Sequence, residues 1–296
     1  MHSSLIFTPS ATNHHNVADK SKYSGTWKRV LNQTGRLDTK PHFNHAIGEL
    51  GEGKAVLFGG ATSSNVYYPG TWVFDGTKSS FNHDGTSPWS RLIQGVTPPM
   101  REDHTLTGID ATHAILFAGI TGKVPRNDTW LFTLDPDCHD TGFGSSCGKW
   151  EEIVFPFDAP IPEARYFHAA AKIQSTGTII MWGGFSGINM WGSSLWYFTT
   201  PSSPEPRVYG KPYTIGFLDD TWVHKCVFTT PHLPSSCSWR KITMLHRDGS
   251  KTSPSKRCMH AMTSFGDAVI MHGGFDGGDV LGDTWTFVLN DSDFDK

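Results

Sequence analysis

The chain has 296 residues, of which 18% are charged, and a formal net charge of -3 at pH 7. This balance argues against nucleic acid or an anionic membrane as the main partner, because both require a concentrated basic surface. No apolar stretch approaches the roughly 20 residues that span a bilayer, while 31 Gly, 18 Pro and 11 Trp are typical of a turn-rich all-β protein with aromatic residues packed on pleated faces.

Along the chain, four short apolar strands each end in Gly-Gly or Ala-Gly. They run from Ala55 to Gly60, Ala114 to Gly119, Thr178 to Gly184 and Ala268 to Gly274. Each follows a strand that begins near a His and precedes a strand that carries Trp72, Trp130, Trp222 or Trp285. A further strand is marked by Trp89, Trp150 or Trp239. A recurrence of roughly 60 residues predicts repeated units of four strands, not one irregular core.

The last repeat ends without its own fourth strand, and a matching segment stands at the other end of the chain. Trp27-Lys28-Arg29-Val30 matches Trp239-Arg240-Lys241-Ile242 in the third repeat. A ring of four-stranded sheets leaves exposed edges unless a strand from the other terminus completes the last sheet. We therefore expect one closed ring over residues 25–296, preceded by an N-terminal extension over residues 1–24.

The pattern resembles the kelch repeat, a β-propeller family, over roughly residues 26–290. The resemblance is carried by the Gly pairs, the two Trp positions and the Arg-x-x-His segments that begin at Arg101, Arg165 and Arg257. It implies an all-β, four-bladed kelch-like propeller closed by the N-terminal strand. Because kelch propellers usually have more blades, the alternative is five blades with one degenerate, and the long segment between Gly184 and Trp222 is the place where a degenerate blade would lie.

The most favoured function is a binding or interaction module that holds a protein or small ligand at the channel mouth. The long insertion supplies aromatic side chains that are typical of contact surfaces, namely Trp191, Trp196, Tyr197 and Tyr213. Carbohydrate binding by such aromatic residues is one alternative. Arg101, Arg165 and Arg257 are further candidates for binding an acidic ligand, although pairing with Asp128, Asp220 or Asp283 is favoured for them by the even spacing of both sets.

Four histidines occupy one repeat position, and they suggest a second class of function. If His45, His104, His168 and His260 converge on the axis, their imidazoles are able to bind a transition metal such as copper, iron or zinc. A metal-dependent enzyme or metal-binding protein is therefore an alternative. Inter-blade hydrogen bonding by buried imidazoles is the favoured role. No catalytic signature is present, so the sequence leaves open whether the protein is an enzyme and gives no catalytic residue.

The cysteines are the residues that indicate the cell compartment. Cys138 with Cys147, and Cys226 with Cys237, lie at equivalent places in two repeats and predict two hairpin disulfides, while Cys258 is expected to be a buried thiol. Disulfides favour an extracellular or secretory-lumen location, and the alternative is a cytoplasmic protein with reduced cysteines. We expect a monomer.

Overall fold

The computed structural model describes residues 5–7, 27–29, 42–63, 66–68, 70–77, 88–92, 95–135, 148–187, 216–230, 233–242 and 253–289. The secondary structure in these ranges consists of β-strands. Within them, no helix is long and apolar enough to cross a membrane.

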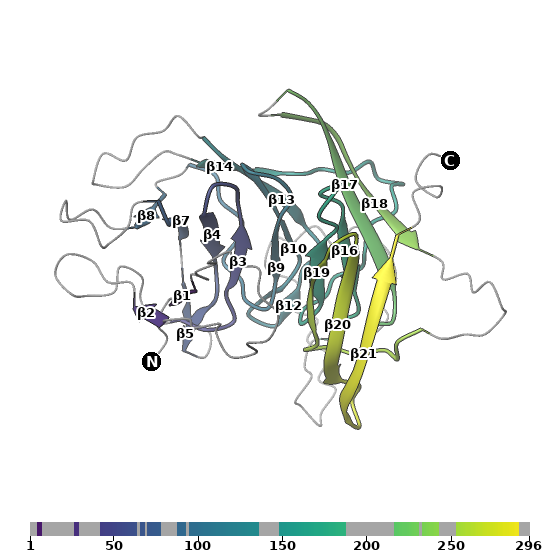
Figure 1. Cartoon of the computed structure of the whole chain (residues 1–296). Helices are drawn as coiled ribbons and strands as arrows, with labels where there is room; N and C mark the ends of the chain where they lie inside the picture. The colour runs from purple at the N-terminus through teal and green to yellow at the C-terminus, as the bar shows by residue number, and fades with distance from the viewer. Residues whose placement is uncertain are drawn as a thin grey trace, which may run out of the picture.

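Four antiparallel sheets follow one another along the chain and form the blades of a four-bladed β-propeller (Figure 1). The strands of blade 1 are β3 (Ala46–Glu49), β4 (Lys54–Phe58), β7 (Thr71–Asp75) and β8 (Trp89–Arg91). The strands of blade 2 are β9 (Thr105–Gly108), β10 (His113–Phe117), β13 (Thr129–Leu134) and β14 (Gly148–Glu152). The strands of blade 3 are β15 (Ala169–Lys172), β16 (Ile179–Trp182), β17 (Thr221–Thr230) and β18 (Leu233–Ile242). The strands of blade 4 are β19 (Ala261–Phe265), β20 (Ala268–Phe275) and β21 (Val280–Val288).

The innermost strands place the blades in chain order around the axis. β3 packs beside β9, β9 beside β15, and β15 beside β19. Three two-stranded sheets accompany the blades: β1 (Leu5–Phe7) with β2 (Trp27–Arg29), β5 (Ala61–Ser63) with β6 (Val66–Tyr67), and β11 (Ile120–Thr121) with β12 (Val124–Pro125). The predicted class and the number of blades are thus confirmed, and four sheets form the propeller in place of the alternative five.

The prediction that the Trp27 strand completes the last blade is wrong for this structure. β2 pairs with β1, in a register that joins Trp27 to Phe7, and lies on the side of blade 1, away from β21 (Figure 1). Blade 4 therefore has three strands among the described residues. The match between Trp27-Lys28-Arg29 and Trp239-Arg240-Lys241 indicated a strand that fits a blade, but a segment of three residues pairs with whichever edge is near, and the apolar Leu5–Phe7 strand supplies one.

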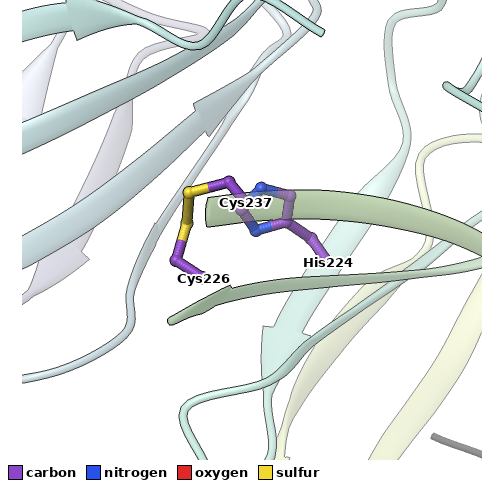
Figure 2. A group of neighbouring side chains, drawn as sticks. All are labelled: His224, Cys226 and Cys237. Carbon is purple, nitrogen blue, oxygen red and sulfur yellow. A yellow bond between two sulfur atoms is a disulfide. The ribbon is translucent and has the colours of Figure 1, made fainter. Parts of the chain in front are cut away.

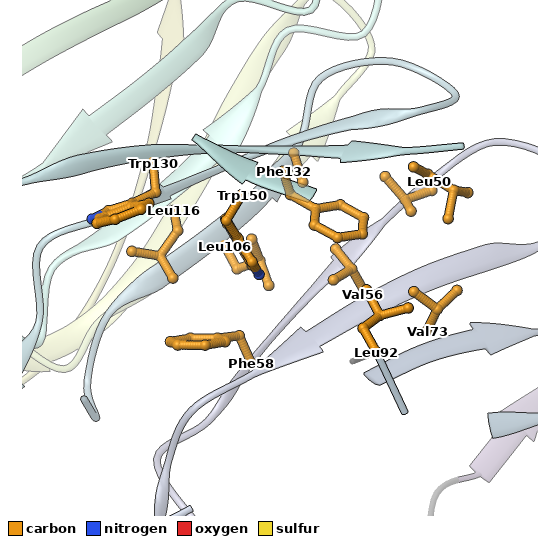
Figure 3. Packing of buried hydrophobic residues seen from close by; sticks show 12 residues of the cluster. Leu50, Val56, Phe58, Val73, Leu92, Leu106, Leu116, Trp130, Phe132 and Trp150 are labelled. Carbon is orange, nitrogen blue, oxygen red and sulfur yellow. The ribbon is translucent and has the colours of Figure 1, made fainter. Parts of the chain in front are cut away.

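Apolar side chains fill the spaces between blades because the middle sheets are covered on both faces. All residues of β10 and β13 are buried, which explains why these strands are mostly apolar on both faces instead of alternating. The largest cluster joins blades 1 and 2, where Phe58 and Val56 of β4 meet Leu116, Phe132 and the Trp150 ring (Figure 3). In blade 4, by contrast, alternate residues of β19 and most residues of β21 are exposed.

The same kind of hydrogen bond links neighbouring blades at two places. The indole Nε1 of Trp150 donates to the Oγ1 of Thr71 in blade 1 at 2.8 Å, and Trp239 donates to Thr129 in blade 2 at 3.0 Å. The equivalent hydroxyl in blade 3, Thr221, is buried and has no hydrogen-bond partner among the described residues. It lines an apolar cleft between blades 3 and 4, together with Trp182 and Trp285. This cleft therefore lies where the Trp of a fourth strand of blade 4 would insert.

Matched valine substitutions test this assignment. Thr129→Val removes the acceptor of the Trp239 indole and leaves a buried N–H unpaired, so we expect it to lower the free energy of unfolding by about 1–3 kcal/mol. Thr221→Val removes a hydroxyl that has no partner, and we expect it to be neutral or slightly stabilising. Urea unfolding of both variants is the measurement. An equal cost at the two positions would show that a donor reaches Thr221 in solution and contradict the assignment.

Candidate functional site

One end of the propeller, here called the loop face, collects most of the irregular segments. It comprises residues 42–45, 95–104, 153–168 and 253–260, which precede the innermost strands, together with the β5–β6 and β11–β12 hairpins and the turn at residues 276–279. Single β-bridges join these segments to the hairpins, for example Phe43 to Ala61 and Glu102 to Ile120. The segments that lead into each innermost strand and the hairpins that join the second strand of a blade to its third lie at the same end. The reason is that successive strands run antiparallel, so every second connection returns to that end.

A continuous arc of backbone lines the mouth of the channel at the loop face. The residue before each repeat histidine is in the left-handed region, with φ between 55° and 57°, at Asn44, Asp103, Phe167 and Met259. The backbone N–H of Asp103 donates to the carbonyl of Asn44 at 3.1 Å, and that of Phe167 donates to the carbonyl of Asp103 at 3.2 Å. The N–H of Met259 donates in turn to Phe167 at 2.9 Å. These turns bring one side chain from each blade to the mouth.

The Gly pairs hold each blade against the next. The N–H of Gly60 donates to the Arg101 carbonyl at 2.8 Å, and Gly119 and Gly184 make the same contact with Arg165 and Arg257 at 2.9 Å. Gly59 has φ 71°, and a Cβ there would lie 2.6 Å from the Arg101 carbonyl oxygen. A side chain at this position is therefore excluded by both conformation and space.

The three repeat arginines form ion pairs with aspartates inside the blades. Their guanidinium groups are buried and bind a carboxylate of the same blade through two hydrogen bonds. The distances are 2.7 and 2.6 Å for Arg101 to Asp128, 2.6 and 2.9 Å for Arg165 to Asp220, and 2.5 and 2.8 Å for Arg257 to Asp283. The favoured pairing is thus observed. Because these donors are engaged inside the blades, we leave Arg101, Arg165 and Arg257 out of the binding surface that we propose.

His104, His168 and His260 lie between blades. His104 packs edge-on against Phe58 and His168 against Phe117, each on the preceding blade, and His168 Nε2 lies 3.0 Å from the Thr105 hydroxyl. Burial lowers the pKa of His104 to about 3 and that of His260 to about 4, so both imidazoles are neutral. In the described ranges, the residues whose ligand atoms gather within 4.8 Å of one another as a group of three or more are His224, Cys226 and Cys237. A metal site at His45, His104, His168 and His260 stays a prediction.

At the mouth, the carboxyl of Asp103 has an unusual pKa. Burial, followed by repulsion from Glu102, raises the pKa of its carboxyl to about 8. The Asp103 charge also raises the pKa of groups from other blades, after burial in each case, namely Tyr67 of blade 1 and Cys258 of blade 4. The carboxyl therefore lies within electrostatic reach of Tyr67 in blade 1 and Cys258 in blade 4. The raised pKa of Asp103 depends on burial, which the sequence by itself does not show.

Exposed apolar side chains concentrate on the loop face. In the described ranges, the large exposed apolar residues outside it are Ile47, Val227, Phe265 and Val288. Those in its connections or at its hairpin tips are Phe43, Val66, Val96, Met100, Val124, Val154, Phe157, Met259 and Val280. Phe157 is 86% exposed. An apolar concentration of this kind marks an interaction surface more strongly than scattered residues do.

Several predicted residues lie outside the described ranges. These are the aromatic candidates Trp191, Trp196, Tyr197 and Tyr213, and the predicted Cys138–Cys147 disulfide. The Cys226–Cys237 disulfide is confirmed, and it joins directly opposed residues of β17 and β18. Cys258 is a thiol outside any disulfide and has no exposed surface, as expected. Burial, with the Asp103 charge as a second cause, raises its pKa to about 12.

Comparison with known proteins supports the resemblance to kelch repeats. No family model matches the chain. Curated relatives include Adagio protein 3 of Arabidopsis thaliana, 24% identical over 70% of this chain and 32% of the relative, and an F-box/kelch-repeat protein of the same plant, 27% identical over 60% and 36%. Kelch domain-containing protein 2 of Bos taurus is 28% identical over 49% of this chain and 30% of the relative. The chain is therefore similar to kelch-repeat proteins and spans about a third of the length of these relatives.

Two arginine partners differ in exposure, which gives a test of the ion pairs. The Asp220 side chain is 8% exposed and that of Asp283 is 41% exposed. Asp220→Asn leaves a buried guanidinium uncompensated, and we expect it to cost about 3–5 kcal/mol of unfolding free energy. Asp283→Asn is expected to cost about 1 kcal/mol, because water replaces the lost carboxylate. Chemical denaturation compares the two variants, and equal costs would contradict the argument.

The raised pKa of Asp103 predicts a pH dependence of stability. Between the unfolded value near 3.8 and the folded value of about 8, the folded protein retains a proton that the unfolded chain releases. Unfolding is therefore favoured progressively as pH rises through this window. Asp103→Asn mimics the protonated acid, so its urea midpoint relative to that of the unsubstituted protein should increase from pH 5 to pH 8. Parallel pH profiles for the two proteins would show that Asp103 is not responsible.

Proposed function

We propose that this protein is a protein-interaction module that binds an extended partner segment across the loop face. The partner segment would place apolar side chains on the rim and a basic side chain, Lys or Arg, against Asp103. The observation that carries the proposal is the concentration of exposed apolar side chains on this one end of the propeller, whereas the opposite end has few. Kelch-type relatives support the class of interaction module.

The apolar rim supports a protein partner of ordinary interface chemistry. Phe43, Phe157 and Met259 lie on three different segments, and aromatic and Met side chains are enriched where proteins meet. The segments that carry them are fixed by the backbone arc and the Gly contacts, so they require little ordering on binding. A rigid face of this kind favours affinity.

The charge at the mouth supports a basic partner group. Asp103 and Glu102 are neighbouring carboxyls, and the Asn44 side-chain amide donates to Glu102 at 3.1 Å. No hydrogen bond from a described residue reaches the Asp103 carboxyl. An ammonium or guanidinium group beside it would favour the ionised form, lowering the raised pKa and releasing a proton on binding. Affinity for a basic segment should therefore increase as pH is raised toward 8.

A peptide-display selection tests the proposed function and requires no identified partner. Random twelve-residue peptides displayed on phage are selected on the immobilised full chain, and the peptides that emerge are synthesised for titration. We expect selected sequences that combine apolar residues with at least one Lys or Arg. Phe157→Ser should weaken their binding at least about tenfold, which corresponds to about 1.4 kcal/mol.

The matched control is Phe265→Ser, because Phe265 is also an exposed phenylalanine, 68% exposed, but lies at the opposite end of the propeller. It should leave binding unchanged. Asp103→Asn should remove the preference for Lys or Arg and the pH dependence. Peptides that bind both serine variants equally, or that lack a basic residue and ignore Asp103→Asn, would overturn the proposal.

The cell compartment and the other candidate functions stay open to measurement. The Cys226–Cys237 disulfide supports an extracellular or secretory-lumen location, with a cytoplasmic location as the alternative. Carbohydrate binding depends on aromatic residues outside the described ranges, and a glycan panel tests it directly. The monomeric state is also a prediction, to be checked by light scattering.

A further inference from the structure

A second cluster of reactive side chains lies in blade 3, away from the loop face. His224 and Cys226 alternate along β17 and therefore share one face of the strand, and Cys237 lies opposite Cys226 on β18 (Figure 2). The ligand atoms of the three residues all lie within 4.8 Å of one another. Cys226 packs with apolar residues of blade 2, so the cluster faces the space between blades 2 and 3.

His224 occupies a position that the other repeats give to phenylalanine. The third strand reads Thr-Trp-Val-Phe at Phe74, Thr-Trp-Leu-Phe at Phe132 and Thr-Trp-Thr-Phe at Phe287, but Thr-Trp-Val-His at His224. The geometry is preserved: Phe74 with Trp89, Phe132 with Trp150 and His224 with Trp239 have ring centroids 5.1, 5.1 and 4.7 Å apart and interplanar angles of 59°, 57° and 56°. The packing at this position thus requires an aromatic ring but does not require the two nitrogen atoms of an imidazole.

The two cysteines also replace packing residues. In blade 2 the positions equivalent to Cys226 and Cys237 are Leu134 and Gly148, which pair across the same two strands. All three positions of the cluster therefore carry apolar or small residues in blade 2 and metal-ligand types in blade 3. A histidine and two cysteines at three contacting positions form a ligand set, because imidazole and thiolate are the groups that Zn²⁺ prefers.

The residues around His224 do not explain why a polar imidazole is buried at this position. The side chain has no exposed surface, and neither ring nitrogen has a hydrogen-bond partner among the described residues. An unpaired buried polar group costs about 1–3 kcal/mol, and a phenylalanine at this position would avoid that cost. Both nitrogens are therefore available, and each sulfur atom lies within 4.8 Å of a ring nitrogen.

We propose that His224, Cys226 and Cys237 form a redox-gated zinc site. In the oxidised protein the two sulfur atoms form the disulfide, and the site is closed to metal. When the disulfide is reduced, the two thiolates and one imidazole nitrogen bind Zn²⁺, with water as the fourth ligand. The site is independent of binding at the loop face.

The reaction balances with a thiol reductant as the electron donor. Two molecules of a small thiol transfer two electrons and two protons to the Cys226–Cys237 disulfide, giving two cysteine thiols and one disulfide of the small thiol. Binding of Zn²⁺ then releases the two thiol protons to solvent. Oxidation by a disulfide oxidant reverses the sequence and releases the metal. Access is adequate, since both cysteines are partly exposed.

The geometry fits a tetrahedral ion. With Zn–S bonds of about 2.3 Å, two thiolate ligands lie about 3.8 Å apart. Cys226 and Cys237 are directly opposed on neighbouring strands, with Cα atoms 4.1 Å apart, so side-chain rotation separates the sulfur atoms without breaking the strand pairing. The His224 ring is already held in place by Trp239. Only the two cysteine side chains have to move.

Cobalt titration of the full chain tests the proposal. Cys138→Ser/Cys147→Ser serves as the background, so that neither of these thiols contributes. Reduced with a phosphine and freed of reductant without oxygen, this protein should bind one equivalent of Co²⁺, with thiolate-to-cobalt charge transfer and the visible bands of a tetrahedral ion. Zn²⁺ should displace the Co²⁺. The same protein with the disulfide intact should bind none.

His224→Phe is the decisive variant because it restores the residue of the other repeats and should therefore fold. In the same background, we expect it to weaken Co²⁺ binding at least about tenfold, while its thermal midpoint in the oxidised state is equal or higher. Cys226→Ser should abolish the charge-transfer band. The proposal is overturned if the reduced background protein binds no Co²⁺, or if His224→Phe binds Co²⁺ as tightly as the background does.

Discussion

The fold depends on the buried arginine that begins each regular repeat. Its guanidinium group binds an aspartate of its own blade, and its backbone carbonyl accepts a hydrogen bond from the Gly pair of the preceding blade. One residue thus joins the strands within a blade and joins that blade to its neighbour. A charge can be buried here because the carboxylate and carbonyl groups satisfy its donors. Every other feature of the loop face is built upon this contact.

Regularity in the scaffold leaves variable positions free to acquire function. The residue before each repeat histidine has the same backbone conformation in all four blades, yet its side chain changes from Asn44 to Asp103, Phe167 and Met259. The propeller fixes where these side chains lie, and the residue type at each position determines which chemical group lies at the mouth. A partly buried carboxyl surrounded by an apolar rim is the result.

The same logic applies between blades, where substitution of a packing residue creates reactivity. His224 retains the ring position of Phe132 but adds two nitrogens, and its neighbours become cysteines in place of Leu134 and Gly148. Blade 3 therefore differs from blade 2 in chemistry, not in architecture. The loop face and this cluster are separate sites, one at the exposed end of the propeller and the other between blades 2 and 3.

The sequence by itself determined the repeat, the number of blades, the Arg–Asp pairs and the Cys226–Cys237 disulfide, because each follows from local spacing that recurs in register. Only the tertiary structure decided how Trp27 pairs, since strand identity does not specify which edge is within reach. It also placed Asp103 within electrostatic reach of Cys258 in blade 4, and His224 beside two sulfur atoms. Such sites depend on the direction in which side chains point between blades, which the periodicity of one strand does not contain.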